Sequence, residues 1–326
     1  MIGVVIPTRN CRPYLERHVA GLSHWIDLAE EVVVVDSDST DGTVEFLQAH
    51  LPHPNLRFLR HPPGLYASWN FGISQIRAKY TAIATCGDTL SREGVESLLL
   101  GMQRLGCDVL ISKPVFEDPE GRALPAPRWP VDEVVETLGL DSPLALTRLE
   151  ALAFMAADLS AAFTGSCASC LFRTEALQQR PFPTDVGASG DGVWALRNAL
   201  QMIWGVTPEV VSTFLKHPID PGSADRKAPT GVQLRPDLFL AQSVAEALDT
   251  GLVSREALQA LGWPEMERRL AEYCVAKADF DRARRGKLPW VFRPSAWGSR
   301  MRRNRARECV RRLRCAILVA EDLRAD

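Results

Sequence analysis

The chain has 326 residues, which is enough for two packed lobes or for one large domain with a helical appendage. Hydrophobic residues make up 46% of the sequence and charged residues 24%, as in soluble globular proteins. The net charge of −2 gives no general attraction to nucleic acid, which is therefore not among the expected partners. No apolar run reaches the roughly 18 residues of a membrane span, and the chain starts as a strand without a basic leader. We expect a cytoplasmic protein.

Eight cysteines are scattered along the chain, most of them within apolar stretches. Cys167 and Cys170 form the one CxxC motif. Neither the second ligand pair of a zinc site nor the strand-to-helix context of a redox site is clear around it. We therefore interpret the cysteines as buried structural thiols in a reducing compartment.

The first third of the chain alternates strands and helices. Apolar and β-branched runs predict strands at residues 2–7, 30–37, 55–62 and 80–85, and helical spacing predicts helices at 11–26, 38–51 and 67–79. Asp41 or Thr40 is the predicted N-cap of the second helix. Repeated β-α-β units with short links predict a parallel sheet with right-handed crossovers. Ligands of such sheets bind at the carboxyl ends of the strands, where three polar loops would meet.

The pattern becomes less regular after residue 90. The predicted elements are a helix at 91–105, a strand at 107–116, a turn-rich segment at 117–130, a helix at 143–159, a strand running into a helix at 165–177, a helix at 190–206 and a strand at 208–218. From residue 220 onward the chain is predicted to be helical, with a basic end. No internal repeats are present, and the phosphate-binding glycine loops G-x-x-x-x-G-K-[ST] and G-x-G-x-x-G are absent after the first strand.

Four segments in order, "VVIPTRN", "VVVVDSDSTDGT", "PPGLYASWNFGI" and "YTAIATCGDTLS", resemble the family 2 glycosyltransferases of the GT-A fold. That family typically shows P-T-x-N after the first strand, then V-V-D-x-x-S-x-D-G-T, an N-x-G helix and a strand ending in an aspartate motif. The resemblance implies an α/β fold, Rossmann-like, with a mostly parallel sheet flanked by helices and a helical C-terminal extension. It divides the chain into a nucleotide-sugar-binding half (1–112), an acceptor-binding and catalytic half (113–220) and a basic extension (221–326).

The resemblance also implies a donor site. Pro7, Thr8 and Asn10 match the loop that lines the nucleotide base and ribose, and Asp36 matches an acidic residue that accepts hydrogen bonds from them. The competing interpretation is that Asp36, Ser39 and Asp41 only cap the next helix. We favour capping for Ser39 and Asp41, and ligand binding for Asp36.

The family's fourth strand commonly ends in an acidic pair, one member touching the ribose and the last binding a divalent ion. Relatives with T-S-D-D-T align with Thr85–Thr89, which puts Gly87 at the first acidic position and Asp88 at the metal-binding one. One carboxylate can suffice for Mg²⁺ or Mn²⁺, because these ions keep waters and take phosphate oxygens. The competing interpretation is that Asp88 caps the helix at 91–105. His217 is a candidate second metal ligand, since a late histidine closes the metal site in many GT-A enzymes.

An inverting transfer needs a carboxylate that removes the acceptor proton. In the family this is an aspartate at the start of a helix, and "SGDGVWALRNAL" makes Asp191 the candidate. A capping role for Asp191 is the alternative. Trp194 and Trp204 are predicted core residues, with a sugar-stacking face as the alternative for Trp194.

The leading hypothesis is an inverting glycosyltransferase that moves a sugar from a nucleotide-diphosphate sugar, with a UDP-sugar expected first, to a saccharide or lipid-linked acceptor hydroxyl. The alternative, suggested by Gly87, is a degenerate relative that binds nucleotide or glycan as a scaffold or regulator. The basic segment around residues 300–315 is interpreted as a solvated helix or, alternatively, as a peripheral contact with the inner face of a membrane. The sugar, the nucleotide base, the acceptor and the oligomeric state are not predicted by these patterns.

Overall fold

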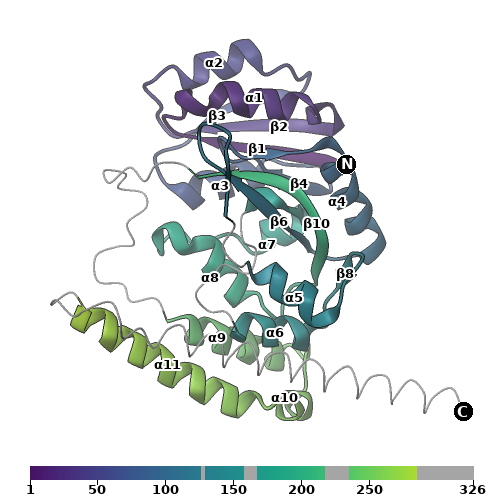
Figure 1. The fold of residues 1–326 in the computed structure, drawn as a ribbon, viewed down its shortest axis with the longest axis vertical. Helices are drawn as coiled ribbons and strands as arrows, with labels where there is room; N and C mark the ends of the chain where they lie inside the picture. The colour runs from purple at the N-terminus through teal and green to yellow at the C-terminus, as the bar shows by residue number, and fades with distance from the viewer. Residues whose placement is uncertain (126–128, 158–166, 217–234, 285–326) are drawn as a thin grey trace, which may run out of the picture. The chain divides into compact units, whose positions relative to one another are not determined.

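The computed structural model describes residues 1–125, 129–157, 167–216 and 235–284 (Figure 1). Its strands are β1 (Ile2–Thr8), β2 (Ala29–Asp36), β3 (Leu56–Arg60), β4 (Tyr80–Ile83), β5 (Thr89–Leu90), β6 (Val109–Glu117), β7 (Ala123–Leu124), β8 (Leu144–Ala145), β9 (Cys170–Arg173) and β10 (Trp204–Leu215). Its α-helices are α1 (Leu15–Ser23), α2 (Thr43–His50), α3 (Leu65–Ser74), α4 (Arg92–Leu105), α5 (Pro130–Leu138), α6 (Arg148–Ala157), α7 (Thr174–Gln179), α8 (Gly190–Arg197), α9 (Pro236–Asp249), α10 (Arg255–Leu261) and α11 (Trp263–Arg284).

The described part of the chain divides into two compact units, and all the strands lie in the first. The first unit comprises residues 1–145, 164–194 and 202–232, and the second comprises the remainder. In the second unit α9 packs against α6 and α11, and α10 packs against α11. The predicted segments 1–112, 113–220 and 221–326 are defined by expected function and not by compactness, and this division stays a prediction.

A single sheet forms the centre of the first unit, with the strand order β3-β2-β1-β4-β9-β6-β10-β5. The strands β3, β2, β1 and β4 are parallel neighbours, and β6 and β10 run in the same direction beyond the antiparallel β9. The predicted mostly parallel sheet flanked by helices is therefore confirmed. Residues Val32 to Val35 of β2 are fully buried, as expected for a β-branched run covered on both faces.

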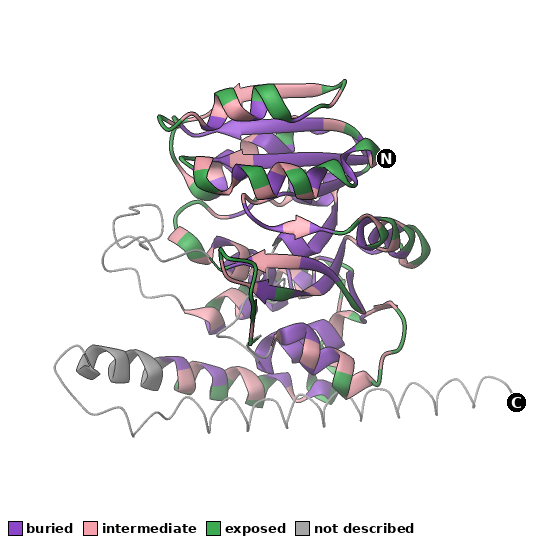
Figure 2. Ribbon diagram, turned by 45° about the horizontal axis from the view of Figure 1, so that its top comes forward, coloured by how far each residue is buried: buried purple, intermediate pink, exposed green. Residues whose placement is uncertain are grey.

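Helices cover both faces of the sheet. On one face Leu15, Leu47 and Leu98 of α1, α2 and α4 join a core with alternate residues of β1, β2 and β4. On the other face α3 packs on β1 and β2. A Cβ on Gly72 of α3 would lie 2.6 Å from a Val5 methyl, so only glycine permits this close approach. Figure 2 shows buried residues along the strands and exposed residues on the outer faces of the covering helices.

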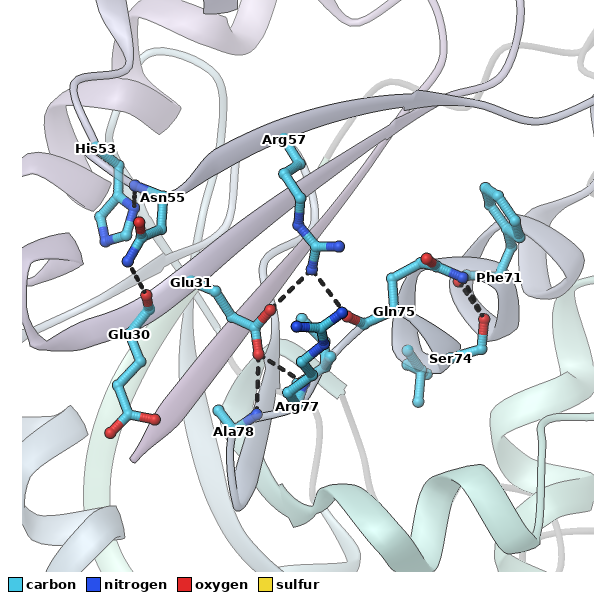
Figure 3. A network of polar contacts seen from close by, with 12 residues as sticks. Glu30, Glu31, His53, Asn55, Arg57, Phe71, Ser74, Gln75, Arg77 and Ala78 are labelled. Carbon is cyan, nitrogen blue, oxygen red and sulfur yellow. Dashed lines mark hydrogen bonds and ion pairs between the residues drawn. The ribbon is translucent and has the colours of Figure 1, made fainter.

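A polar network fastens the amino end of the sheet, away from the loops predicted to bind the donor. The Glu31 carboxylate accepts hydrogen bonds from Arg57 Nη2 at 2.7 Å and from the Arg77 and Ala78 amides at 2.6 and 2.8 Å (Figure 3). Arg57 also donates to the Gln75 carbonyl at 2.8 Å. These bonds join β2, β3 and the α3–β4 link, and so stabilise the strands whose other ends carry the predicted site.

The structure corrects several predicted boundaries. The helix predicted at 190–206 ends at Arg197, and Trp204 already belongs to β10, where Trp204, Gly205 and Val206 pair with β6. The N-cap of α2 is Gly42 rather than Asp41 or Thr40. Trp194 and Trp204 are buried core residues, as predicted, with ring centroids 5.7 Å apart.

Candidate active site

The ends of β1 and β2 carry the first part of the site. Thr8 and Asp36 are paired in the strand register, and Thr8 Oγ1 donates a hydrogen bond to Asp36 Oδ1 at 3.1 Å. The other carboxylate oxygen accepts the Ser39 amide at 3.0 Å. Asp36 is only 3% exposed and does not cap α2. The arrangement fixes the carboxylate at the carboxyl end of the strand while leaving lone pairs on both oxygens.

The loop after β1 is tied to the loop after β2. Asn10 has a left-handed backbone with φ 47°. Its amide donates to Ser39 Oγ at 2.9 Å, and its side-chain oxygen accepts the Thr40 amide at 2.9 Å. Asn10 is exposed, whereas Pro7 is half-buried in β1. The structure therefore joins Thr8 to Asp36 by a direct hydrogen bond and links Asn10 to Asp36 through Ser39.

Asp41 binds the first residue of α2, Thr43, although the N-cap residue of this helix is Gly42. One oxygen accepts the Thr43 amide at 3.1 Å and the Thr43 hydroxyl at 2.6 Å. The other oxygen accepts the Arg12 amide at 3.0 Å. Asp41 thus joins the start of α2 to the β1–α1 loop.

The turn after β4 holds Gly87 and Asp88. Gly87 has φ 94°, a left-handed backbone conformation that favours glycine. The shape of the turn therefore accounts for a glycine at this position. Asp88 is 8% exposed. Its carboxylate accepts hydrogen bonds from the Thr85 hydroxyl and from the Leu215 amide, the latter at 2.9 Å. The N-cap of α4 is Ser91, which accepts the Gly94 amide at 3.0 Å, so the interpretation that Asp88 caps this helix is wrong.

Burial raises the pKa of Asp88 from 3.8 to about 6, against the hydrogen bonds from Thr85 and Leu215 and the positive charge of Arg17. This carboxyl group is therefore held ionised less firmly than an exposed aspartate. A cation beside it would lower the pKa, because an opposite charge favours the carboxylate.

His18, a residue that the sequence analysis did not select, supports the same turn. Its Nδ1 lies 3.3 Å from the Asp88 carbonyl oxygen. His18 is fully buried, and this burial lowers its pKa to about 4, while the bond to Asp88 opposes the shift. The ring is neutral at physiological pH, so Nδ1–H is the donor to the carbonyl. The burial of His18 could have been predicted from the sequence, because Leu15, His18 and Leu22 recur at helical spacing on the buried face of α1.

The predicted second metal ligand, His217, lies outside the described residues. Leu215, the last residue of β10, is the described residue of this segment that contacts Asp88. Among the residues that the structure describes, no group of three histidine, cysteine, aspartate or glutamate side chains could hold a metal ion.

Asp191 is the second residue of α8, and its Oδ1 accepts the Gly192 amide at 2.7 Å. Burial raises the pKa of Asp191, while the bond from Gly192 and a side-chain hydrogen bond from Tyr66 oppose the shift. The Tyr66 hydroxyl also lies 3.3 Å from the Ala188 carbonyl oxygen. A carboxyl group with a raised pKa is suited to accept a proton near neutral pH.

Helix α3 connects the surroundings of Asp191 to the ends of the parallel strands. Ser68 of α3 hydrogen bonds to Ser37, the residue after Asp36, with 2.6 Å between their Oγ atoms. Two residues earlier on the same helix is Tyr66. Asn70 exchanges hydrogen bonds with the backbone of Phe182 at 2.8 and 2.9 Å, which anchors the segment that leads to α8. The N-x-G pattern of this helix thus positions the chain around Asp191.

No described helix has both the length and the apolar composition needed to cross a membrane.

Comparison with known proteins gives a consistent result. The profile of the family described as glycosyl transferase family 2 matches residues 3–179, just over half of the chain. The chondroitin synthase of Escherichia coli is 30% identical over 101 residues, which cover 30% of this chain and 15% of that protein. The glycosyltransferase GlyG of Streptococcus pneumoniae is 28% identical over 114 residues, which cover 34% of this chain and 38% of that protein. The matches therefore span well under half the length of either relative.

Among solved structures, TarS of S. aureus (residues 1–349, in complex with UDP-GlcNAc) aligns with a TM-score of 0.55 and 18% identity, covering 97% of this chain and 92% of that one. The same protein in complex with UDP gives a TM-score of 0.50 and 19% identity, covering 80% and 74%. These likenesses confirm the predicted fold class. With the profile match over more than half of its residues, the chain belongs to glycosyl transferase family 2.

Proposed function

We propose that the protein transfers a sugar from a nucleotide-diphosphate sugar to an acceptor hydroxyl, with inversion and with the assistance of a divalent cation. The observation that carries this proposal is the hydrogen bond between Thr8 Oγ1 and Asp36 Oδ1, 3.1 Å long, at the ends of two neighbouring strands. Ser39 links this pair to Asn10. These residues match the family's donor loop, and the chain belongs to that family.

The donor nucleotide would bind through Asp36 and the β1 loop. An ionised carboxylate accepts about four hydrogen bonds, and Asp36 uses one at each oxygen within the chain. The remaining lone pairs can accept from a ribose hydroxyl or from an N–H group of the base. Pro7, Thr8 and Asn10 would line the same nucleotide.

The surroundings of Asp88 fit a weak divalent site. Each carboxylate oxygen has one protein donor, Thr85 or Leu215, and so keeps a lone pair for a cation. Mg²⁺ and Mn²⁺ bound by a single carboxylate keep waters and take phosphate oxygens as ligands, so the site would form together with the diphosphate. The cation would supply electrostatic stabilisation of the leaving diphosphate. We propose His217 as a second ligand on the strength of the family resemblance.

Asp191 would act as the general base. Its raised pKa keeps its affinity for a proton above that of an exposed aspartate, and Gly192 and Tyr66 fix the direction of its oxygens. The acceptor hydroxyl would give its proton to this carboxylate as the oxygen attacks the anomeric carbon.

The donor class is the next part of the proposal. The TarS structures hold UDP and UDP-GlcNAc, and this supports testing UDP-sugars first. The acceptor would be a saccharide or a lipid-linked hydroxyl. Contact of the C-terminal basic segment with an anionic membrane surface rests on the sequence, because residues 285–326 lie outside the described residues.

No observation in the structure favours the alternative of a non-catalytic relative. Its support in the sequence was Gly87, and the left-handed backbone there provides a conformational reason for glycine that is independent of activity.

The test is a thermal-shift and calorimetric panel of UDP-, GDP-, CDP- and dTDP-sugars, each with and without Mn²⁺. Asp36→Asn and Asp36→Ala should weaken nucleotide binding in both conditions, whereas Asp88→Ala should remove only the part that depends on Mn²⁺. Asp27→Ala is the matched control, because this exposed carboxylate precedes β2 at its other end and pairs with Arg92 at 2.7 Å. Equal nucleotide affinity in wild type and all variants would remove the assigned donor site.

A further inference from the structure

Two cysteine thiols meet between the loops that follow β1 and β4. The sulfur atoms of Cys11 and Cys86, which are 75 positions apart in the sequence, lie 2.8 Å from each other. Neither cysteine forms a disulfide in the structure. A disulfide has a sulfur–sulfur distance of about 2.05 Å, so bond formation requires an approach of less than about 1 Å.

The surroundings keep the pair in place. The Cys11 amide donates to Thr43 Oγ1 at 3.0 Å, and that hydroxyl lies 3.9 Å from the Cys11 sulfur. The Cys86 sulfur lies 3.9 Å from the Pro7 carbonyl oxygen. Cys86 is half-buried and Cys11 is 6% exposed, so Cys86 is the more accessible residue of the pair. The contact with Cys11 and burial raise the pKa of the Cys86 thiol, so its oxidation is expected to be slow at neutral pH.

Cys107, another cysteine of the first unit, has a different neighbour. It is fully buried, and its sulfur lies 3.4 Å from the sulfur of Met102, a thioether that forms no disulfide. Cys107 is therefore a suitable control for the contact between Cys11 and Cys86.

We propose that Cys11 and Cys86 form a redox-sensitive pair that hydrogen peroxide or a small disulfide such as oxidised glutathione converts into an intramolecular disulfide. With peroxide, the Cys86 sulfur attacks one oxygen, the O–O bond breaks and water leaves, giving a sulfenic acid. The Cys11 sulfur then attacks the Cys86 sulfur and expels the hydroxyl group, which takes the Cys11 proton and leaves as water. Two thiols lose two electrons, and one peroxide becomes two waters. With oxidised glutathione, the same two electrons release two glutathione thiols.

The disulfide would connect the chain beside Asn10 to the turn that carries Gly87 and Asp88. This inference goes beyond the proposed function, since it concerns oxidation of the protein and not sugar transfer. It makes the segment around Asp88 responsive to oxidants.

The test is peptide mapping of the full-length protein after oxidation, quenching with an alkylating agent and digestion with trypsin. Cys11 falls in the peptide of residues 10–17 and Cys86 in that of residues 80–92. We expect these two peptides to appear as one linked species that dithiothreitol separates. We also expect the oxidised protein to melt at a higher temperature, because the cross-link constrains the unfolded chain.

Three variants make the result specific. Cys86→Ser should abolish the linked species and the rise in melting temperature. Cys11→Ser should instead trap Cys86 as a mixed disulfide with glutathione, because the thiol that would displace the glutathione is gone. Cys107→Ser is the matched control and should retain the cross-link. Separate modification of Cys11 and Cys86 in the wild-type protein, or a bond from either one to a different cysteine, would overturn the proposal.

Discussion

The raised pKa of Asp88 makes a prediction about folding stability in the metal-free protein. Its pKa is 3.8 when unperturbed and about 6 in the folded chain, mainly because the carboxylate is buried. The native state therefore binds a proton at Asp88 more tightly than the unfolded state does. The stability contribution is fully present below the unfolded pKa, and it is lost as the pH rises through the folded pKa.

The magnitude follows from the two pKa values. A difference of roughly 2 pKa units corresponds to about 3 kcal/mol of unfolding free energy, most of which falls between the two values. Asp88→Asn keeps the size of the side chain but does not titrate. The stability of wild type minus that of Asp88→Asn should therefore rise by about 2 kcal/mol from about pH 7.5 to about pH 4.5, because the other groups cancel in this difference.

The assay is urea unfolding of both proteins at a series of pH values in the presence of a chelator. Asp27→Asn provides a control. The hydrogen bond with Arg92 lowers the pKa of Asp27 from 3.8, so its contribution is lost only at lower pH, and the difference between wild type and this variant should stay flat from about pH 7.5 to about pH 4.5. Parallel stability curves for wild type and Asp88→Asn across this range would refute the assignment of Asp88 as a desolvated carboxyl group.

Three further predictions concern Asp191, the proposed general base, its partner Tyr66, and Glu31 at the amino end of the sheet. Asp191→Asn should fold and bind donor nearly as wild type but transfer sugar about 10²–10⁴-fold more slowly; initial rates within a few-fold of wild type would exclude Asp191 as the base. The Tyr66 hydrogen bond lowers the pKa of Asp191, so Tyr66→Phe should move the acidic limb of the pH–rate profile to higher pH, whereas a purely structural role would leave that limb unmoved. Glu31→Ala should cost about 2–4 kcal/mol in urea unfolding, since it leaves the partly buried Arg57 and two amides without their acceptor, yet should not change nucleotide affinity per folded molecule.

The strands of the first unit could be predicted because their sequences are buried on both faces. The runs that become β1 and β2 are rich in valine and isoleucine, and the run that becomes β4 combines apolar residues with threonine. The boundaries of all three differ from the prediction by at most two residues. The end of the predicted helix at 190–206 was wrong for a physical reason. Trp204, Gly205 and Val206 pair with Val109, Leu110 and Ile111, and helical spacing of apolar residues carries no information about a partner strand so far away.

The residues of the candidate site were selected by their match to the family motifs. The structure places Thr8, Asp36 and Asp88 at the end of a strand or in the turn beyond it. The contact of Asp88 with Leu215 could not be predicted, because the Leu215 amide is a backbone group 127 positions away. The contact of Cys11 with Cys86 likewise depends on how two loops meet.

Gly87 and Asp88 have different structural roles, although the family resemblance treats their positions as an acidic pair. Gly87 forms the left-handed turn, and Asp88 binds the end of β10. The left-handed backbone at residue 87 favours glycine, although an aspartate can adopt such a conformation, as Asp38 does with φ 55°. The turn in return directs Asp88 toward the end of β10, where the Leu215 amide binds one of its oxygens. His18 of α1 holds the carbonyl of the same residue. A helix and a distant strand thus fix the position of one carboxylate, and this fixed position is the structural basis for proposing Asp88 alone as the acidic group of the metal site.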